Sequence, residues 1–467
     1  MNNNNKGIQF LVSSILFLLC FCIDNTAISQ VVTYTTTANG DLKFRQEIIS
    51  PTSHATSSNI LTVNASKRYQ KMEGFGYAFT GGSAQLIAAL PLEKRNALMT
   101  EIFGNQSNHL GLSYLRVSMG ASDLDAAVFS YCDLKPGQTD TALQHFSLAQ
   151  DTNYLIPLLQ QAIKINPNLK VMASPWSPPV WMKTNGASIG GHLLPQYYKT
   201  YARYFVKYIQ AMKAKGISIA SVTIQNEPEH GGNNPSMLMN AQEQTVFVRD
   251  YLGPQLKAAK LATEIVIWDH NADHPEYPIS VLNDAKAKSF IAASAFHLYL
   301  GNESALSKVH QLHPDKKIYF TEQWTGAKGE FAGDLMWHLE HIVMGTIQNW
   351  SSLVLEWNLA ADAQYAPHTQ GGCTECKGAF TIQGEMVQRN VSYYIIGQIA
   401  QFVPAGSIRI AAATNNDNLK TIAFLTPSGK KVALVLNTGN ADQNLSMTAV
   451  KKYNFSIPKQ SAITIVW

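Results

Sequence analysis

The 467-residue sequence is poor in charged side chains, and its two charge signs nearly cancel. Asp, Glu, Lys and Arg make up 15% of the residues, and 36 basic against 32 acidic side chains leave a formal charge of only +4. This small charge gives no support for nucleic acid or an anionic membrane as the main partner. Hydrophobic residues make up 46%, which excludes a disordered chain and a coiled coil.

Cysteine is also scarce, with five residues in the whole chain, two of them close to the N-terminus. The three that remain are Cys132, Cys373 and Cys376, and an odd number argues against a disulfide framework. The spacing of Cys373 and Cys376 suits either a local disulfide or half of a metal site. Because no second Cys-x-x-Cys pair completes a zinc tetrad, we expect no structural zinc.

Long apolar runs are absent except near the N-terminus, where Ile8–Ile23 is mostly apolar. Sixteen residues with polar interruptions are too short for a transmembrane helix, so we expect no stable membrane span. The small residues Ala27 and Ser29 occupy the two positions that a signal peptidase reads, which predicts cleavage near Ser29 and an exported protein. A lipoprotein would use Cys20 or Cys22 instead, but each follows a bulky residue.

From about residue 70, short apolar runs alternate with longer helical patterns, which is typical of βα units around a parallel sheet. Helical spacing is clear over Tyr197–Lys215. Eight such strands predict a closed (β/α)8 barrel of the α/β class. The predicted strands are Gly74–Tyr77, Tyr114–Ser118, Val171–Ser174, Ser221–Gln225, Ile265–Trp268, Ala293–His297, Ile318–Thr321 and Leu353–Glu356.

The flanks of this region read as an all-β sandwich formed from both chain ends. We predict a signal peptide over 1–29, sandwich strands within 30–68, the barrel over 69–390, and the rest of the sandwich over 391–467. The predicted sandwich strands are Val31–Phe44, Ile60–Val63, Thr421–Phe424, Lys431–Leu436, Leu445–Val450 and Ala462–Val466.

Two carboxylates stand at the ends of barrel strands, where the reacting groups of such barrels lie. Strand four leads into Asn226-Glu227-Pro228, and strand seven ends in Glu322-Gln323-Trp324. Three βα units separate them, so we expect Glu227 and Glu322 to face each other across the barrel mouth. Hydrolysis of a glycosidic bond needs such a pair, one protonated and one ionised. A single glutamate at a strand end is usually an ion-pair partner. The hypothesis of a glycosidase therefore rests on the two glutamates together with the motifs that contain them.

Polar and aromatic residues beside these strand ends suit a sugar ring. Asn226 is placed to bind a sugar 2-hydroxyl, and Asp123 is the best candidate for gripping hydroxyls. Arg116 is expected to orient a carboxylate from below. Rings at or just past the strand ends offer stacking surfaces, although each alone is more often core. They are Trp176, Tyr299, Trp324 and Trp357, with Trp181 in the loop after strand three.

These segments closely resemble glycoside hydrolase family 30, the glucosylceramidase-like group of retaining β-glycosidases. The resemblance implies that Glu227 is the general acid/base and Glu322 the nucleophile, without a metal or an organic cofactor. It also implies sugar contacts from Asp123, Trp176, Asn226, Tyr299 and Trp357. The matching segments are Met72–Thr80, Leu115–Asp123, Ala173–Gly186, Gln225–Pro228, Phe296–Tyr299, Thr321–Trp324 and Trp357–Ala360.

Two loops favour a glucan over a lipid as the substrate. The Cys-containing loop Gly371–Ala379 resembles the microbial β-1,6-glucanase branch of that family, whereas lysosomal glucosylceramidases lack such a pair. The segment Glu229–Pro235 is short and polar, with no apolar lip for a ceramide. We therefore expect a secreted retaining β-glycosidase that acts on a carbohydrate, with endo-β-1,6-glucanase as the first hypothesis.

Other functions stay open at this stage. Within the same class these are a glucosylceramidase or exo-β-glucosidase, and a β-xylanase or β-xylosidase. The xylanase branch should have a basic residue that binds a uronic acid, and none is evident in the sequence. A non-catalytic carbohydrate-binding protein would usually have lost one carboxylate. A metal-dependent hydrolase would use Asp269-His270 with Asp273-His274, or His310 with His313. Solvated loop and helix histidines explain those residues better.

Overall fold

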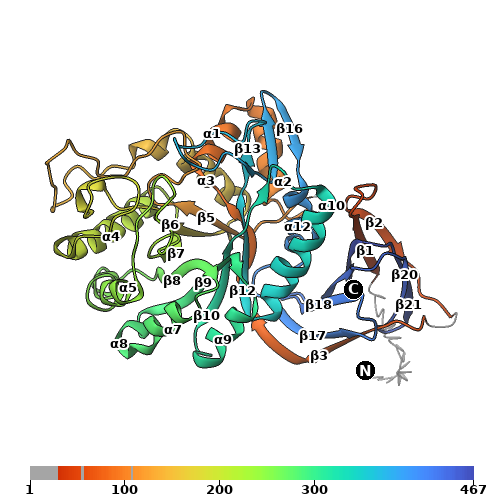
Figure 1. Cartoon of the computed structure of the whole chain (residues 1–467). Coiled ribbons are helices and arrows are strands. Elements are labelled where there is room, and N and C mark those ends of the chain that lie inside the picture. The colour runs from red at the N-terminus through yellow and green to blue at the C-terminus, as the bar shows by residue number, and fades with distance from the viewer. Residues whose placement is uncertain (1–29, 54–56, 107–108) are drawn as a thin grey trace, which may run out of the picture.

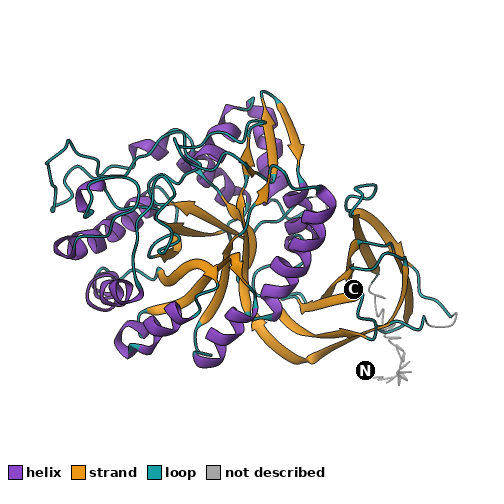
Figure 2. Cartoon of the chain, in the orientation of Figure 1, coloured by secondary structure: helices purple, strands orange, loops and turns teal. Residues whose placement is uncertain are grey.

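The computed structural model describes residues 30–53, 57–106 and 109–467, which form two domains side by side (Figure 1). A barrel of strands surrounded by helices makes up one domain, and the other consists of strands and loops (Figure 2). The predicted signal peptide and both of its cysteines lie outside the described residues.

The larger domain is a closed barrel of eight parallel strands, as predicted from the alternating pattern. The strands pair in chain order, and β12 closes the ring by pairing with β4. Each predicted barrel strand overlaps an observed one. The strands are β4 (Gly74–Ala78), β5 (Tyr114–Ser118), β6 (Lys170–Ser174), β7 (Ile219–Thr223), β8 (Glu264–Ala272), β9 (Ile291–Gly301), β10 (Lys317–Glu322) and β12 (Ser351–Asn358).

Helices cover the outside of the barrel (Figure 2). In α4 (Tyr198–Ala214), Tyr201, Phe205, Tyr208 and Met212 recur on one face and are fully buried, as their helical spacing predicts. The other α-helices are α1 (Gly81–Ala89), α2 (Leu92–Phe103), α3 (Leu155–Ile165), α5 (Ala241–Val246), α6 (Gly253–Ala258), α7 (Glu276–Asn283), α8 (Ala285–Lys288), α9 (Ser304–Leu312), α10 (Phe331–Trp337), α11 (Thr346–Gln348) and α12 (Val391–Ala400). Shorter or wider helical turns are η1 (Ala149–Thr152), η2 (Val180–Met182), η3 (Pro195–Tyr197), η4 (Phe247–Leu252) and η5 (His338–Gly345).

The inside of the barrel is filled by its own side chains. A buried cluster there combines large rings, such as Tyr114 and Tyr319, with the small side chains of Ala293 and Ala295. Strands that are buried on both faces need apolar residues at consecutive positions, which is why they read as continuous apolar runs. At Gly76 in β4 the packing leaves no space, because a Cβ atom would lie 1.8 Å from the backbone oxygen of Tyr114.

The second domain is one nine-stranded mixed sheet that curls into a nearly closed sandwich. Its strand order is β2-β1-β22-β19-β18-β17-β3-β20-β21, so the sheet combines strands from both chain ends, as predicted. The bounds are β1 (Val31–Thr37), β2 (Arg45–Ile49), β3 (Ile60–Lys71), β17 (Ile408–Thr414), β18 (Leu419–Leu425), β19 (Lys431–Asn437), β20 (Gln443–Thr448), β21 (Lys452–Ile457) and β22 (Ser461–Val466).

The prediction of one strand over Val31–Phe44 was wrong in its second half. The strand ends at Thr37, and the chain turns through Gly40 before β2 begins at Arg45. Asn39 and Asp41 hydrogen-bond within this turn, which is the local chemistry that favours turns over strands. The sequence reading also missed β2, β17 and β21.

Helix α12 lies between the two domains (Figure 1). Gln398 on this helix donates to Thr36 of β1, and the hydroxyl of Thr464 of β22 donates to the backbone and side-chain oxygens of Gln398. On the barrel side, the Tyr77 hydroxyl donates to the backbone oxygen of Ser392 at 2.6 Å. These buried hydrogen bonds join the domains through one helix.

Three short pairings cap the barrel near the C-terminal ends of its strands. β11 (Thr325–Gly326) pairs with β14 (Cys376–Lys377). A small sheet joins β13 (Ala360–Ala361), β15 (Phe380–Gln383) and β16 (Met386–Arg389). These pairings fix the loops that follow β10 and β12.

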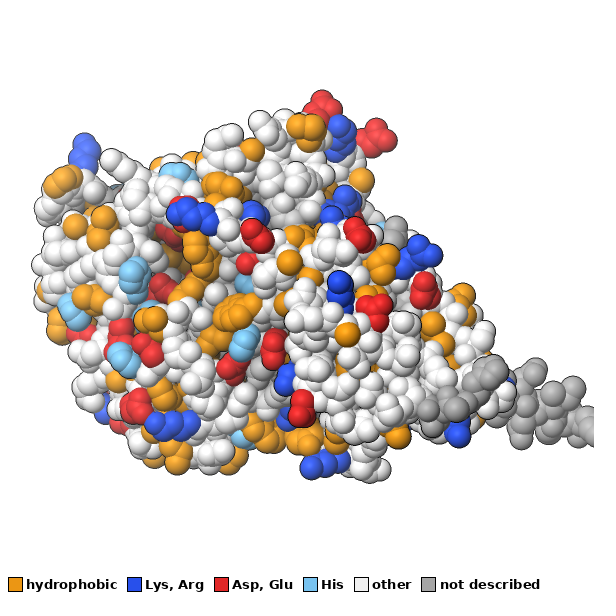
Figure 3. All heavy atoms as spheres, turned by 45° about the vertical axis from the view of Figure 1, so that its right-hand side comes forward, with side chains coloured by type: hydrophobic (Ala, Val, Ile, Leu, Met, Phe, Trp, Pro, Cys, Tyr) orange, Lys and Arg blue, Asp and Glu red, His pale blue; other side chains and the backbone are white. Residues whose placement is uncertain are grey.

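The surface in Figure 3 carries acidic and basic side chains interspersed with hydrophobic ones, and neither sign forms a continuous patch on this face. Among the described residues, no helix has both the length and the apolar character needed to cross a membrane.

The close packing at Gly76 makes it a sensitive position. We expect Gly76→Ala to lower the free energy of unfolding by about 3 kcal/mol or more, because the new methyl meets backbone that cannot move. Gly333→Ala in α10 is the matched control, since nothing lies within 4 Å of its Cβ position. It should stabilise the protein by about 0.4–1 kcal/mol. Urea denaturation measures both, and equal effects would contradict the packing.

Candidate active site

A cavity of about 380 Å³ opens at the C-terminal ends of the barrel strands. Seven of the eight residues singled out in the sequence line it: Asp123, Trp176, Glu227, Tyr299, Glu322, Trp324 and Trp357. The eighth, Asn226, is buried just before Glu227, and its Oδ1 accepts a 2.6 Å hydrogen bond from Arg116. The structure therefore brings the selected residues together.

Glu227 reaches the cavity through an irregular backbone. It follows β7 with a φ of 46°, and its N–H donates to the backbone oxygen of Asp269 at 3.0 Å. Trp268 and Asp269 also have positive φ angles, where β8 shifts register against β9. Bulky residues seldom adopt this conformation, and bulges of this kind turn side chains towards active sites. The ends of β7 and β8 are thus tied together in a strained arrangement.

Glu322, the last residue of β10, is held at both carboxylate oxygens. Arg116 donates to Oε2 at 2.6 Å, and the Tyr299 hydroxyl donates to Oε1 at 3.0 Å. Arg116 is 0% exposed and lies on β5 beneath the cavity. The expectation that Arg116 orients a carboxylate from below is confirmed.

Asp269 is the second buried partner of Arg116. Its Oδ2 accepts from Arg116 at 2.9 Å and from Ser174 at 2.8 Å, while its Oδ1 accepts from Thr321 at 2.7 Å. Burial opposes ionisation, but the charge of Arg116 and the hydrogen bonds hold the pKa of Asp269 far below its usual range. Asp269 is therefore a permanent buried anion.

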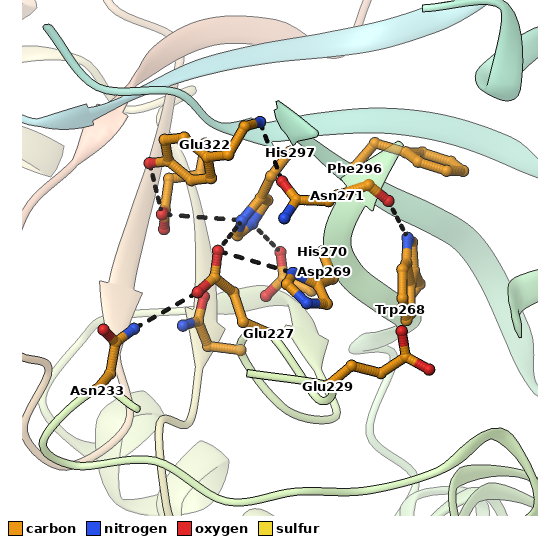
Figure 4. A network of polar contacts seen from close by, with 12 residues as sticks. Glu227, Glu229, Asn233, Trp268, Asp269, His270, Asn271, Phe296, His297 and Glu322 are labelled. Carbon is orange, nitrogen blue, oxygen red and sulfur yellow. Dashed lines mark hydrogen bonds and ion pairs between the residues drawn. The ribbon is translucent and has the colours of Figure 1, made fainter. Parts of the chain in front are cut away.

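His297 on β9 connects Asp269 to both cavity carboxylates (Figure 4). Its Nε2 lies 3.3 Å from Asp269 Oδ1, and its Nδ1 lies 3.0 Å from Glu227 Oε1 and 3.8 Å from Glu322 Oε1. One ring nitrogen within 4 Å of both carboxylates means that Glu227 and Glu322 lie close together across the cavity.

The electrostatics favour a proton on His297. Burial would lower the pKa of His297, but the charge of Glu322 and hydrogen bonds to Asp269 and Glu227 outweigh it and raise the pKa to about 9. Burial would raise the pKa of Glu227, but the imidazoles of His270 and His297 hold it well below its usual range. Burial raises the pKa of Glu322, although His297 and Arg116 oppose this. From the sequence we expected the proton to be on one of the two carboxyl groups. In the structure His297 holds it, one hydrogen bond away from Glu227.

Cys373 and Cys376 form a disulfide that lines the cavity. The backbone N–H of Cys373 donates to Asp123 Oδ2 at 3.3 Å, and Thr369 N–H donates to the Asp123 backbone oxygen at 2.9 Å. The open choice between a disulfide and half of a metal site is therefore decided for the disulfide. Burial and the charge of Glu322 raise the pKa of Asp123 to about 7.

The same loop touches the other walls of the cavity. Cys376 belongs to β14, which pairs with β11 directly after Trp324. On the Glu227 side, Asn234 Nδ2 donates to the backbone oxygen of Gln370 at 2.8 Å. One loop therefore connects the segments that carry Asp123, Glu227 and Glu322.

The aromatic side chains divide into two groups. Trp176 and Trp357 pack with ring centroids 5.4 Å apart, and the Arg116 guanidinium lies 4.8 Å from the Trp176 ring centre. Together with Tyr299 and Trp324 they line the cavity. Trp181 does not line it, because its Nε1 donates to the backbone oxygen of Cys132 and its ring packs on Tyr197.

The sequence reading did not assign His297, Asp269, His270 or Asn233 to this site. Asn233 lies at the rim, with Nδ2 3.5 Å from Glu227 Oε2. The signals were present, since His297 is within a matching segment and Asp269-His270 directly follows the predicted strand Ile265–Trp268. Their roles depend on which strand ends meet, which the sequence alone does not show.

The metal-dependent alternative receives no support from its own residues. Asp269 faces Arg116 and His297, and His274 pairs with Glu229 at 2.7 Å, away from Asp269. His310 stacks on Trp350 with ring centroids 4.0 Å apart. Within the described residues, the group of His, Cys, Asp and Glu that comes close enough to share an ion is Glu227 with His270 and His297, which has only His270 in common with that alternative.

Comparisons with known proteins match the barrel and the C-terminal part of the sandwich to one family. The model of the glycosyl hydrolase family 30 TIM-barrel domain matches residues 72–403, and that of the family's beta sandwich domain matches residues 406–465. The endo-1,6-beta-D-glucanase neg1 of Aspergillus fumigatus is 33% identical over 447 residues, covering 89% of each chain. The lysosomal acid glucosylceramidase of Mus musculus is 28% identical, covering 83% of this chain and 79% of its own.

A solved structure is similar over almost its full length. The endo-beta1,6-glucanase BT3312 superposes with a TM-score of 0.89 at 34% identity, covering 94% of this chain and 99% of that chain.

The pKa of His297 predicts a pH dependence. It lies above the ordinary value of 6.5, so the stabilisation by the imidazolium is complete below about pH 6.5 and is lost as the pH rises through about 9. We expect both the free energy of unfolding and the reaction rate to fall over this range, because the same proton is lost. Urea denaturation and initial rates between pH 6 and 10 measure this. A rate that already falls near pH 6.5 would contradict the coupling.

We expect removal of the disulfide to lower the affinity for substrate. Replacing both Cys373 and Cys376 with Ser removes the disulfide, so the N–H donor to Asp123 is no longer held in place. We expect KM to rise about tenfold, which corresponds to the loss of one hydrogen bond to a charged group. Cys132→Ser is the control, since Cys132 is a free, buried cysteine outside the cavity lining. An unchanged KM in the double variant would show that the loop does not position Asp123.

Proposed function

The chain belongs to glycosyl hydrolase family 30, a family of retaining β-glycosidases, and from this premise we propose that it is an endo-acting β-1,6-glucanase. In this proposal Glu227 is the general acid/base and Glu322 the nucleophile. The observation that carries it is the pair itself, with two carboxylates brought together by one imidazole inside a cavity lined by aromatic rings.

In the first step, Glu322 attacks the anomeric carbon while the glycosidic C–O bond breaks. Arg116 and Tyr299 hold the attacking carboxylate at its two oxygens, so it is oriented before the substrate arrives. Glu227 gives its proton to the departing oxygen. That proton reaches Glu227 along the 3.0 Å hydrogen bond from His297.

In the second step, water attacks the anomeric carbon of the glycosyl–Glu322 ester, and Glu227 accepts a proton from this water. The bond to Glu322 breaks, and the anomeric configuration is the same as at the start. Glu227 then passes this proton back to His297 along the same hydrogen bond, which restores the starting charges. One imidazole nitrogen within 4 Å of both carboxylates is compatible with the close pair, about 5–5.5 Å apart, that retaining enzymes use.

The choice of β-1,6-glucan is supported by the relatives and by the cavity. The Aspergillus enzyme and the solved structure both carry that activity in their names, at 33% and 34% identity over most of their length. The mouse glucosylceramidase is less similar, at 28%. The rim near Glu227 is formed by His230 and Asn233, which are polar and suit hydroxyls better than a ceramide.

We propose that the enzyme works outside the cytoplasm. The Cys373–Cys376 disulfide supports this, because disulfides persist in oxidising compartments. Export after cleavage of the predicted signal peptide is consistent with such a location.

Replacing the two glutamates separates their roles. With an aryl β-glucoside, Glu322→Gln should reduce the rate more than about 10⁴-fold, and Glu227→Gln by about 10²–10⁴-fold. Azide should restore turnover in both, giving the β-glycosyl azide with Glu227→Gln and the α-glycosyl azide with Glu322→Gln. Glu229→Gln is the control, since Glu229 pairs with His274 outside the cavity lining. The opposite products would exchange the two roles.

Product analysis tests the substrate. Linear β-1,6-glucan should yield a ladder of short gluco-oligosaccharides, because an open cleft cuts within a chain. Glucosylceramide should be a poor substrate under the same conditions. Release of glucose alone, mainly from the lipid, would replace the proposal by a glucosylceramidase.

A further inference from the structure

Three potential metal ligands meet beside the cavity, from the ends of three neighbouring strands. They are Glu227 after β7, His270 on β8 and His297 on β9, and their ligand atoms all lie within 4.8 Å of one another. Glu227 Oε1 is 3.0 Å from His297 Nδ1 and 3.7 Å from His270 Nδ1. Two ligands of a tetrahedral zinc ion stand roughly 3.3 Å apart, given bonds of about 2.0–2.1 Å. The two spacings from Glu227 bracket that value.

His270 contributes an unused ligand atom. Its side chain is buried, with 7% exposure, yet its Nδ1 has no hydrogen-bond partner within the described residues. A buried polar atom without a partner is uncommon and needs a physical reason. Here it faces Glu227 Oε1 at 3.7 Å, too far for a hydrogen bond and suitable for sharing an ion. His270 also lines the cavity, so an ion can reach it from solvent.

Hydrogen bonds on the far side of the ring hold His297 in place. Its Nε2 faces Asp269 Oδ1 at 3.3 Å, and Asp269 is itself held by Arg116, Ser174 and Thr321. A carboxylate behind a histidine is the arrangement that orients ligands in zinc sites, because it holds the N–H on one ring nitrogen and turns the other nitrogen towards the metal. His297 is thus already oriented with Nδ1 towards the other two ligands.

The donor set selects the kind of ion. Two imidazoles and one carboxylate suit zinc and similar transition metals, whereas magnesium and calcium prefer oxygen ligands throughout. Three protein ligands leave a fourth position for water on the cavity side. The buried anions Asp269 and Glu322 lie next to the site and offset the added positive charge.

We propose that Glu227, His270 and His297 bind one divalent transition-metal ion, with zinc as the representative, and that this ion reversibly inhibits the enzyme. Binding displaces the proton that His297 and Glu227 share, since the ligands must be deprotonated. The ion then occupies the lone pairs of Glu227 and His297, so these residues no longer pass a proton to the leaving group. The inhibition rests on the proposed acid/base role of Glu227, whereas the binding itself does not.

The experiment uses the full-length protein after treatment with a chelator and buffer exchange. Isothermal titration calorimetry with zinc should give one ion per chain, and cobalt should give the visible absorption of a tetrahedral site. Zinc should stop hydrolysis of an aryl β-glucoside, and added EDTA should restore the rate. His270→Phe keeps the ring and removes a ligand, so zinc affinity should fall at least about a hundredfold. Each variant's rate with zinc is compared with its own rate without it.

Two controls separate the outcomes. His274→Phe should bind zinc as the unmodified protein does, because His274 is exposed and pairs with Glu229. Glu322→Gln should lose hydrolysis and still bind one zinc, since Glu322 is not a ligand, so calorimetry decides the site even if the proposed function fails. No zinc bound to the unmodified protein, equal affinity in His270→Phe, or full activity with zinc bound would each overturn the proposal.

Discussion

The active site depends on one buried charge, the guanidinium of Arg116 inside the barrel. It is fully buried, and an unpaired cation there would cost several kcal/mol. Asp269 at 2.9 Å and Glu322 at 2.6 Å neutralise it, so both carboxylates must sit where β8 and β10 end. Asp269 in turn faces His297, and His297 bonds Glu227. The positions of Glu322, Asp269, His297 and Glu227 thus depend on the pairing of Arg116.

This network also explains why the site can hold a proton so close to Glu227. Three carboxylates surround one imidazole, and their combined charge raises the pKa of His297 to about 9 in spite of its burial. The proton stays within one hydrogen bond of Glu227. The lone pairs of His297 and Glu227 that share this proton are also the ones proposed to bind a transition metal. The bound proton and the proposed inhibition by metal ions therefore have one structural cause. His270, whose Nδ1 makes no hydrogen bond within the described residues and lies 3.7 Å from Glu227 Oε1, completes the proposed metal ligands.

Much of this arrangement could be predicted from the sequence, and the exceptions have physical reasons. The eight barrel strands were predictable because strands buried on both faces must be apolar at consecutive positions. Glu227 and Glu322 were predictable because they end two of these strands. Strand β2 was not, since nearly all of its residues are exposed and it is held by pairing with β1 rather than by burial. Strand β17 was missed because its alanine-rich segment has little β propensity of its own.

The roles of His297 and Asp269 could not be read from the chain because they arise from contacts between strand ends. Positive φ angles at Trp268 and Asp269 turn the end of β8 so that Asp269 meets Arg116 and His297. No local pattern in the sequence encodes that turn. The disulfide loop is similar, since Cys373 and Asp123 are far apart in the chain and meet only at the cavity.

The central claim is that Glu322, held by Arg116 and Tyr299, forms a covalent bond with the sugar. Incubation with 2-deoxy-2-fluoro-β-glucosyl fluoride tests it directly, because the fluorine slows the second step and lets the ester accumulate. Mass spectrometry of the intact protein should show one added fluoroglucosyl group, and peptide analysis should locate it on Glu322. A label on another residue, or turnover without any covalent adduct, would contradict the account.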